Sequence, residues 1–209
     1  MIQGITYASC YVYSPTGAGA VCERSRLLRA LLKSGHAGFM LKYALRVRQQ
    51  AEDSPPLAGF FGGSDVLIPV PGSEPYMAGG LWAAEHLSIA LVNAGLGGVA
   101  WSGLHRIRAV PKSATAARGD RPTVSLHYES FVVERPLVLP DRIVLIDDVV
   151  TKGRTLLAAA SRVREAFPCA KIRAFALLRT MGLISGVHRL LDPCTGEILW
   201  RRGDAHRRP

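Results

Sequence analysis

One segment, residues 142–155 (RIVLIDDVVTKGRT), constrains the fold of this chain more than any other part of the sequence. It contains four consecutive aliphatic residues, Ile143 to Ile146, which are followed by the adjacent acids Asp147 and Asp148. Two valines and a short loop with a central glycine, Gly153, come next. The aliphatic run predicts a buried strand, and acids followed by a loop at the end of such a strand are typical of the carboxyl edge of a parallel sheet.

A helix is predicted immediately after this loop. Leu156, Ala160, Val163 and Phe167 are spaced by four, three and four residues, which is one face of a 3.6-residue period. The order along the chain is therefore a buried strand, an acidic pair, a loop with hydroxyls and glycine, and a helix N-terminus.

This order indicates a particular ligand chemistry. A helix N-terminus presents unpaired N–H groups that suit a phosphate, and Gly153 lets the backbone approach an anion while Thr151 and Thr155 can donate to it. Carboxylates repel a phosphate, so Asp147 and Asp148 suit hydroxyls or a metal-bearing group. A phosphate and a diol together describe a ribose 5-phosphate. The alternative is a plain strand–helix corner, which does not explain two acids at the end of a buried strand.

The block resembles the motif with which type I phosphoribosyltransferases bind 5-phosphoribosyl-1-pyrophosphate (PRPP), where the loop has the form T-T-G-x-T. By this resemblance, Asp147 and Asp148 are the catalytic acids and hold the ribose hydroxyls. The remaining residues of the motif would surround the 5-phosphate: Val149, Val150, Thr151, Lys152, Gly153, Arg154 and Thr155. Lys152 and Arg154 depart from the family pattern and add positive charge, which would tighten the phosphate site unless both side chains point outward.

The rest of the chain alternates predicted strands and helices. Strands are expected at 65–70, 99–102, 131–133, 142–149 and 171–178, and helices at 25–33, 39–50, 78–94 and 155–167. Such alternation indicates an α/β fold with a mostly parallel sheet covered on both faces. The resemblance implies the type I phosphoribosyltransferase fold, with a small helical N-terminal segment and a C-terminal hood.

A Pro- and Gly-rich connection at residues 53–63 suggests a boundary. We expect an N-terminal mixed or helical segment over residues 1–63 and a phosphoribosyltransferase-like α/β domain over residues 64–209, including the hood and a basic tail. Tyrosines 7, 11 and 13 alternate near the start and predict a short edge strand. The last nine residues, 201–209, are expected to form a frayed basic tail.

Two further segments are expected to contact the pyrophosphate. The first is the loop after the strand at 65–70: Val70, Pro71, Gly72 and Ser73, whose alternative is a rigid turn. The second is a polar, basic segment at 105–126, which would act as a flexible lid unless it is only a solvated loop. Its candidate ligands are Arg106, Arg108, Lys112, Arg118 and Arg121. His105 and His127 flank it, and such histidines are more often surface residues.

The resemblance implies Mg²⁺ as the cofactor, carried by PRPP, so no metal site built by the protein alone is expected. The partners expected are PRPP and a nitrogen-heterocycle acceptor, and the resemblance favours a homodimer. The net charge of +10, from 26 basic and 16 acidic residues, leaves open a nucleic-acid partner or simply solvated basic faces. No run of about 18 apolar residues predicts a membrane span, and scattered cysteines without a signal peptide favour the cytoplasm.

Within the family, the chain looks most like the ComF-like branch, on the helix RLLRALLKSG, on the IPVP segment at 68–71, and on LHRIRAVPKSATAARGDRP. Only Cys10 and Cys22 stand where that branch usually has paired cysteines. The expected function is transfer of ribose 5-phosphate between PRPP and a nucleobase-like heterocycle, with release of pyrophosphate. The alternative is a non-catalytic PRPP sensor or ComF-like accessory protein that binds nucleic acid or a helicase-like partner.

Overall fold

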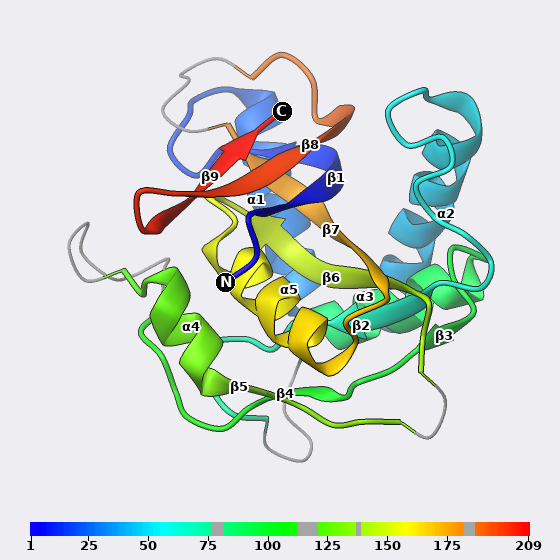
Figure 1. The fold of residues 1–209 in the computed structure, drawn as a ribbon. Coiled ribbons are helices and arrows are strands. Elements are labelled where there is room, and N and C mark those ends of the chain that lie inside the picture. Colours follow the sequence, from blue (N-terminus) through cyan, green and yellow to red (C-terminus); the bar gives the residue numbers. More distant parts are fainter. Residues whose placement is uncertain (77–81, 113–120, 137–138, 182–186) are drawn as a thin grey trace.

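The computed structural model describes residues 1–209 except 77–81, 113–120, 137–138 and 182–186 (Figure 1). In chain order the elements are β1 (Gly4–Tyr13), α1 (Ala20–Lys33), α2 (Ala37–Asp53), β2 (Val66–Pro69), α3 (Ala83–Asn93), β3 (Val99–Ala100), β4 (Leu104–Arg106), α4 (Val124–Ser130), β5 (Phe131–Val133), β6 (Arg142–Val150), α5 (Arg154–Ala166), β7 (Lys171–Thr180), β8 (Leu191–Arg201) and β9 (Asp204–Arg208).

A seven-stranded, mostly parallel sheet forms the centre of the molecule, in the order β3-β2-β6-β7-β1-β8-β9. The strands β3, β2, β6, β7 and β1 run parallel to one another, whereas β8 and β9 are antiparallel additions next to β1. A second, two-stranded sheet pairs β4 with β5. The predicted α/β architecture is confirmed. Because β2, β6, β7 and β1 run in the same direction, their carboxyl ends and the loops that follow them meet at one edge.

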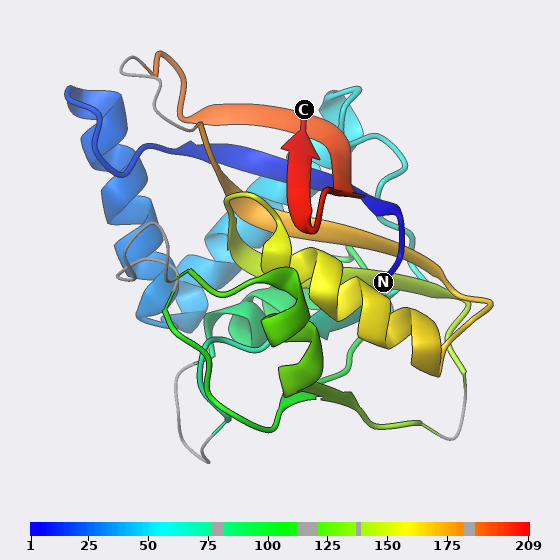
Figure 2. The same cartoon turned by 60° about the vertical axis from the view of Figure 1, so that its left-hand side comes forward.

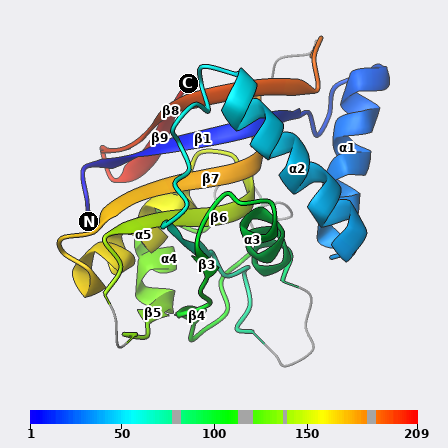
Figure 3. The same cartoon turned by 90° about the vertical axis from the view of Figure 1, so that its right-hand side faces the viewer.

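The helices cover both faces of the large sheet (Figure 3). On one face α1, α2 and α3 pack against the sheet, and their core includes Leu28, Met40, Leu87, Val144 and Phe175. On the other face α5 packs directly on the sheet with α4 beyond it, and the core there includes Tyr7, Leu145, Leu156, Val163 and Ala174. Burial on both faces explains why β6 is an uninterrupted aliphatic run, since Ile143, Val144, Leu145 and Ile146 are each 0% exposed.

Both ends of the chain belong to this sheet, which differs from two expectations. The N-terminal tyrosine segment is β1, an interior strand of ten residues between β7 and β8, so the prediction of a short edge strand is wrong. Residues 204–208 pair with β8 as β9, so the expected frayed tail is also wrong. Tyr7 is fully buried and Ala205 is 1% exposed, which shows that apolar contacts order both ends.

Two other segments also differ from expectation. The basic segment at 105–126 is not one continuous loop, because β4 and the start of α4 lie within it. The hood was expected over residues 179–200, and its part from residue 191 onward belongs to β8, which lengthens the sheet. The proposed segments 1–63 and 64–209 share one sheet through β1. Within the described part of the chain, no helix is long and apolar enough to cross a membrane.

Candidate functional site

The loop between β6 and α5 has the geometry of an anion site. Gly153 is the N-cap residue of α5 and has a φ of 86°, in the left-handed region that glycine adopts readily. A Cβ atom at Gly153 would also lie 2.7 Å from the side chain of Ile198 in β8. Among the described residues no side chain caps α5, so its first N–H groups remain available to an external acceptor. Together with the helix dipole, these groups favour an anion beside the exposed residues Thr151 and Lys152.

The two acids, Asp147 and Asp148, lie near the carboxyl end of β6, just before this loop. The carboxylate of Asp148 is 2.7 Å from the Nζ atom of Lys33, and Asp147 Oδ1 accepts a hydrogen bond of 2.8 Å from the backbone N–H of Asp148. Lys33 is the last residue of α1. The first helix of the chain therefore supplies a cation to the acidic pair, although 110 residues and more separate them in sequence.

The two carboxyl groups titrate in opposite directions. Burial raises the pKa of Asp147 well above its ordinary value, and the neighbouring charge of Asp148 raises it further. Burial also acts to raise the pKa of Asp148, but the ammonium of Lys33 outweighs it and the net pKa is lowered. Between the two pKa values the pair holds a single proton. It then presents one hydroxyl that can donate and one carboxylate that accepts, which complements a pair of adjacent hydroxyls.

Arg154 and Lys152, which depart from the family pattern, meet a carboxylate of the C-terminal hairpin. Arg154 donates from Nε and Nη2 to Asp204 at 2.6 and 2.7 Å, and Lys152 Nζ lies 3.4 Å from the same carboxylate. Arg154 Nη1 donates to the carbonyls of Arg121 and Pro122. Arg154 therefore joins α5 to two other segments. Lys152 is more exposed, with a side chain 60% accessible, and can still reach an anion in the loop.

Figure 2 shows the β8–β9 hairpin on the α5 side of the sheet, next to the loop that leads into α5. Partial burial acts to raise the pKa of Asp204, but hydrogen bonds from Arg154 and from the Ala205 N–H lower it to about 2. Asp204 is thus a carboxylate over most of the pH range. A fixed negative charge stands beside the loop where the phosphate would bind.

The second predicted loop, residues 70–73, follows β2 at the same edge of the sheet. The Val70 carbonyl accepts from the indole of Trp82 at 2.9 Å, and the Ser73 carbonyl accepts from the Val110 N–H at 2.8 Å. Gly72 does not have a positive φ, and a Cβ atom there would meet nothing within 4 Å. Neither backbone conformation nor crowding requires glycine at position 72. One side-chain and one backbone hydrogen bond hold this loop in place.

Arg106 is the residue that fixes the loop at 70–73. It is 4% exposed, its guanidinium lies 4.2 Å from the centre of the Phe131 ring, and it donates to the carbonyls of Pro71 and Gly72 and to the Ser130 hydroxyl. Burial lowers its pKa to about 10, an effect that the charge of Asp147 partly offsets. Arg106 is therefore a buried support of the loop and not a mobile lid residue.

His127 lies against Arg106 in the same interior region. It is 4% exposed, and its ring is stacked on Phe131. Nδ1 lies 3.4 Å from Arg106 Nη2, and Nε2 lies 3.4 Å from the Thr155 hydroxyl. Burial lowers the pKa of His127 to about 4, and the charges of Arg106 and Arg154 act in the same direction. The expectation that His127 is a surface residue is wrong.

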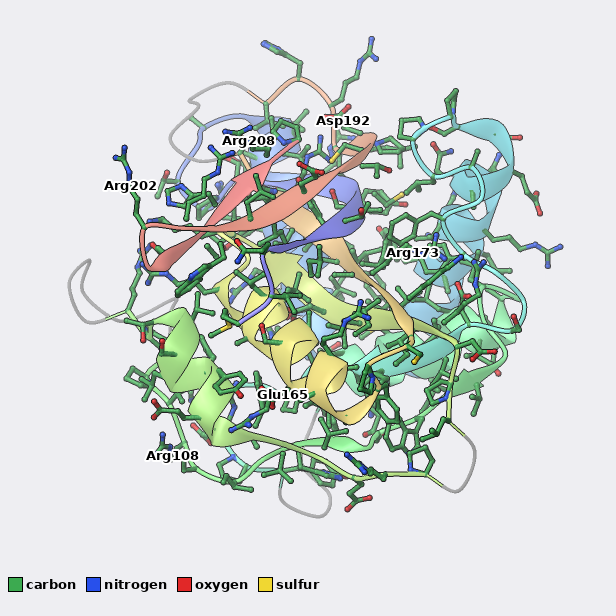
Figure 4. The ribbon with its side chains drawn as sticks, in the orientation of Figure 1. Arg108, Glu165, Arg173, Asp192, Arg202 and Arg208 are labelled. Atoms are coloured by element: carbon green, nitrogen blue, oxygen red, sulfur yellow. The ribbon has the colours of Figure 1, made fainter. Side chains whose placement is uncertain are left out.

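The other candidate lid residues lie further out. Arg108 forms a 2.6 Å ion pair with Glu129, and Figure 4 places its side chain at the periphery of the molecule, below α4. Lys112 forms a 2.9 Å ion pair with Glu74, and all four side chains are more than half exposed. Arg118 lies outside the described residues. The structure thus does not bring Arg108 together with the loop at 70–73, whereas it does so for Arg106.

Sequence reasoning assigned no role in this region to Lys33 or Asp204, and it placed His127 at the surface. Lys33 stands in the last turn of its helix before Ser34-Gly35, and that helix end was a point of the family resemblance. His127 and Thr123, the N-cap of α4, lie in a helix that the polar composition concealed. Asp204 could not be recognised from the sequence, because a single acid among basic residues in a terminal segment is common and indicates no particular site.

Mg²⁺ that arrives on a phosphorylated substrate needs only one or two carboxylates from the protein. Asp147 and Asp148 are hard oxygen donors at the correct edge of the sheet, so the residues present fit such an ion. In the part of the chain that the structure describes, no group of three or more His, Cys, Asp or Glu side chains could form a metal cage.

No family model matches this chain, and no curated protein matches it in sequence. Among solved structures, a xanthine-guanine-hypoxanthine phosphoribosyltransferase from Helicobacter pylori is similar, with 18% sequence identity and a TM-score of 0.37. The match covers 73% of this chain and 79% of the other. A likeness at this level carries no argument about function, which has to come from the residues of the site.

Proposed function

We propose that this protein is a phosphoribosyltransferase that binds PRPP with Mg²⁺. It transfers the 5-phosphoribosyl group from PRPP to a nitrogen heterocycle and releases pyrophosphate, or catalyses the reverse reaction. One observation carries the proposal. An uncapped helix N-terminus behind a left-handed glycine follows directly on two adjacent acids, the partly exposed Asp147 and the buried Asp148, at the carboxyl edge of a parallel sheet. An anion site next to a diol site matches a ribose 5-phosphate.

In this proposal the 5-phosphate accepts hydrogen bonds from the first N–H groups of α5 and from the hydroxyls of Thr151 and Thr155. Lys152 adds a positive charge at the open side. Asp147 and Asp148 hold the 2′- and 3′-hydroxyls, and Lys33 keeps Asp148 ionised so that it remains an acceptor. Val149 and Val150 pair in register with Leu178 and Arg179 of β7, so these two residues would position the loop.

The pyrophosphate would lie between this loop and residues 70–73. Bound Mg²⁺ would supply charge neutralisation for the pyrophosphate as it leaves. The protein stabilises charge at this place through the backbone of residues 70–73, which Arg106 holds from behind. Arg108 and Lys112 would have to leave Glu129 and Glu74 to reach the pyrophosphate, and exposed ion pairs of this kind contribute less than about 1 kcal/mol.

The arrangement of the cations also supports a second candidate, a non-catalytic PRPP sensor. Arg106 and Arg154 use their donors on other parts of the protein, and Arg108 is paired with Glu129. Among the described residues few cations are available for the pyrophosphate, and a site of this kind can still bind the ribose 5-phosphate part. Both candidates share the ribose 5-phosphate site and differ only in the chemistry at C1′.

Turnover separates the two candidates. The protein would be incubated with PRPP, Mg²⁺ and mixtures of purines, pyrimidines and related heterocycles, and pyrophosphate release would be followed. We expect release that depends on one of the heterocycles and is lost in an Asp147→Asn/Asp148→Asn double variant. PRPP binding without release for any heterocycle would favour the sensor. If PRPP does not bind at all, both candidates are wrong.

A further inference from the structure

A buried arginine–histidine pair connects the two loops of the candidate site. Arg106 donates to the carbonyls of Pro71 and Gly72 in the loop after β2, and its Nη2 atom faces Nδ1 of His127 at 3.4 Å. On the other side of the imidazole, Nε2 faces the hydroxyl of Thr155 at 3.4 Å. Thr155 is the second residue of α5, beside the phosphate loop. The pair thus spans from one candidate anion loop to the other.

The chemistry of Arg106 determines which nitrogen of His127 carries the proton. A guanidinium has only donors and stays charged even with its pKa lowered to about 10, so Nδ1 must be the acceptor in this contact. The neutral imidazole then carries its hydrogen on Nε2. This hydrogen points at Thr155, so the Thr155 hydroxyl oxygen is the acceptor of that hydrogen bond.

This arrangement also determines where the Thr155 hydroxyl can donate its own hydrogen. A threonine hydroxyl has one hydrogen and can rotate, so on its own it can act as donor or acceptor toward a ligand. When its oxygen accepts from Nε2–H, its hydrogen is left for another acceptor. An anion beside the N-terminus of α5 is such an acceptor.

We infer that His127 is a positioning residue that fixes the Thr155 hydroxyl as a hydrogen-bond donor to the phosphate, through a chain that starts at Arg106. The identity of the phosphate as the 5-phosphate of a ribose rests on the proposed function, whereas the proton arrangement of the chain does not. The same Arg106 shapes the loop at 70–73. The two loops therefore depend on one buried group, and they are expected to respond together when that group is changed.

The proton arrangement can be measured without any ligand. Nitrogen chemical shifts of ¹⁵N-labelled His127 at neutral pH are expected to show a neutral ring protonated at Nε2. Replacement of Arg106 by Gln is expected to weaken this preference, because the amide can also accept from Nδ1–H. A ring protonated at Nδ1 in the unchanged protein would overturn the inference, whatever the protein binds.

Ligand binding gives the second test, with ribose 5-phosphate as the probe in titration calorimetry. His127→Phe keeps a ring that can stack on Phe131 but removes both nitrogens, and we expect about three- to tenfold weaker binding, the loss of one neutral hydrogen bond. His127→Gln is the conservative variant, since its amide can accept from Arg106 and donate to Thr155, and it is expected to restore most of the affinity.

Because His127 acts through Thr155 in one hydrogen-bonded chain, we expect that the losses of ribose 5-phosphate affinity are not additive. Thr155→Val is expected to weaken binding about as much as His127→Phe, and the double variant is expected to lose no more than either single variant. Additive losses, or no rescue by Gln, would show that His127 acts only in packing. If the unchanged protein does not bind ribose 5-phosphate, the proposed function fails, and the nitrogen measurement alone decides on the proton arrangement.

Discussion

At the scale of single residues, two positions define the site. Gly153 combines a positive φ with a contact to Ile198 that leaves no room for a side chain, so two independent constraints select glycine there. Asp148 is buried next to a second acid and is kept ionised by Lys33. Buried acids without partners are costly, and here their cost is offset by a cation from a distant helix.

Asp148→Asn tests the diol site. The change removes the charge that accepts from a ribose hydroxyl, and a charge-assisted hydrogen bond contributes about 1.5–3 kcal/mol, so we expect PRPP affinity to fall by about tenfold or more. Lys33 loses its partner, but its side chain is half exposed and water can solvate it, so the fold should persist. Titration calorimetry measures the affinity, and circular dichroism checks the fold.

Glu52→Gln is the matched control for this change. Glu52 also pairs with a cation, Arg48, at 3.0 Å, but it lies on the exposed face of α2. We expect its PRPP affinity to equal that of the unchanged protein. If Asp148→Asn also leaves the affinity unchanged, the acidic pair does not bind the ribose.

At the scale of elements, β9 is the strand that alters the site most. It carries Asp204 to the cations of the phosphate loop, and Arg207 reaches the Thr180 carbonyl at the end of β7. β9 therefore runs along one side of the carboxyl edge where the ligand is proposed to bind. Its carboxylate would compete with the proposed phosphate for Lys152, and it holds Arg154 in a two-point pair.

Asp204→Asn separates these two roles. Loss of the negative charge is expected to raise the affinity for ribose 5-phosphate severalfold at low salt, with a smaller gain at high salt because the charges are partly exposed. The gain should vanish when Lys152 is replaced by Ala. A lower affinity in Asp204→Asn would mean that the pair with Arg154 shapes the loop and that competition is negligible.

At the scale of the whole molecule, the sequence predicted the parallel layer well and the ends of the chain poorly. Residues 142–155 predict β6, the loop and α5 because aliphatic burial, a left-handed glycine and an amphipathic helix are all local patterns. β1 and β9 were misjudged because their burial depends on partners far along the chain. Tyr7 is buried in the core that α5 and β8 share, and among the described strands β9 pairs only with β8.

In the candidate site, too, the local parts could be predicted from the sequence and the parts that depend on distant segments could not. The acids and the phosphate loop are contiguous in sequence, so their pattern could be read directly. Lys33, His127 and Asp204 reach this region from α1, α4 and β9, and only the folded sheet brings them together. Long-range contacts of this kind leave no spacing that a single sequence could reveal.

We propose that the edge formed by β6, its loop and α5 binds a phosphorylated ribose. Thermal unfolding with and without PRPP and Mg²⁺ tests it most directly. At about 100 times its dissociation constant a ligand adds roughly 2.7 kcal/mol of stability, which for a domain of this size raises the Tm by roughly 5–10 °C. We expect such a rise with PRPP and none with the analogue that lacks the 5-phosphate. No rise at millimolar PRPP, or an equal rise with both compounds, would contradict it.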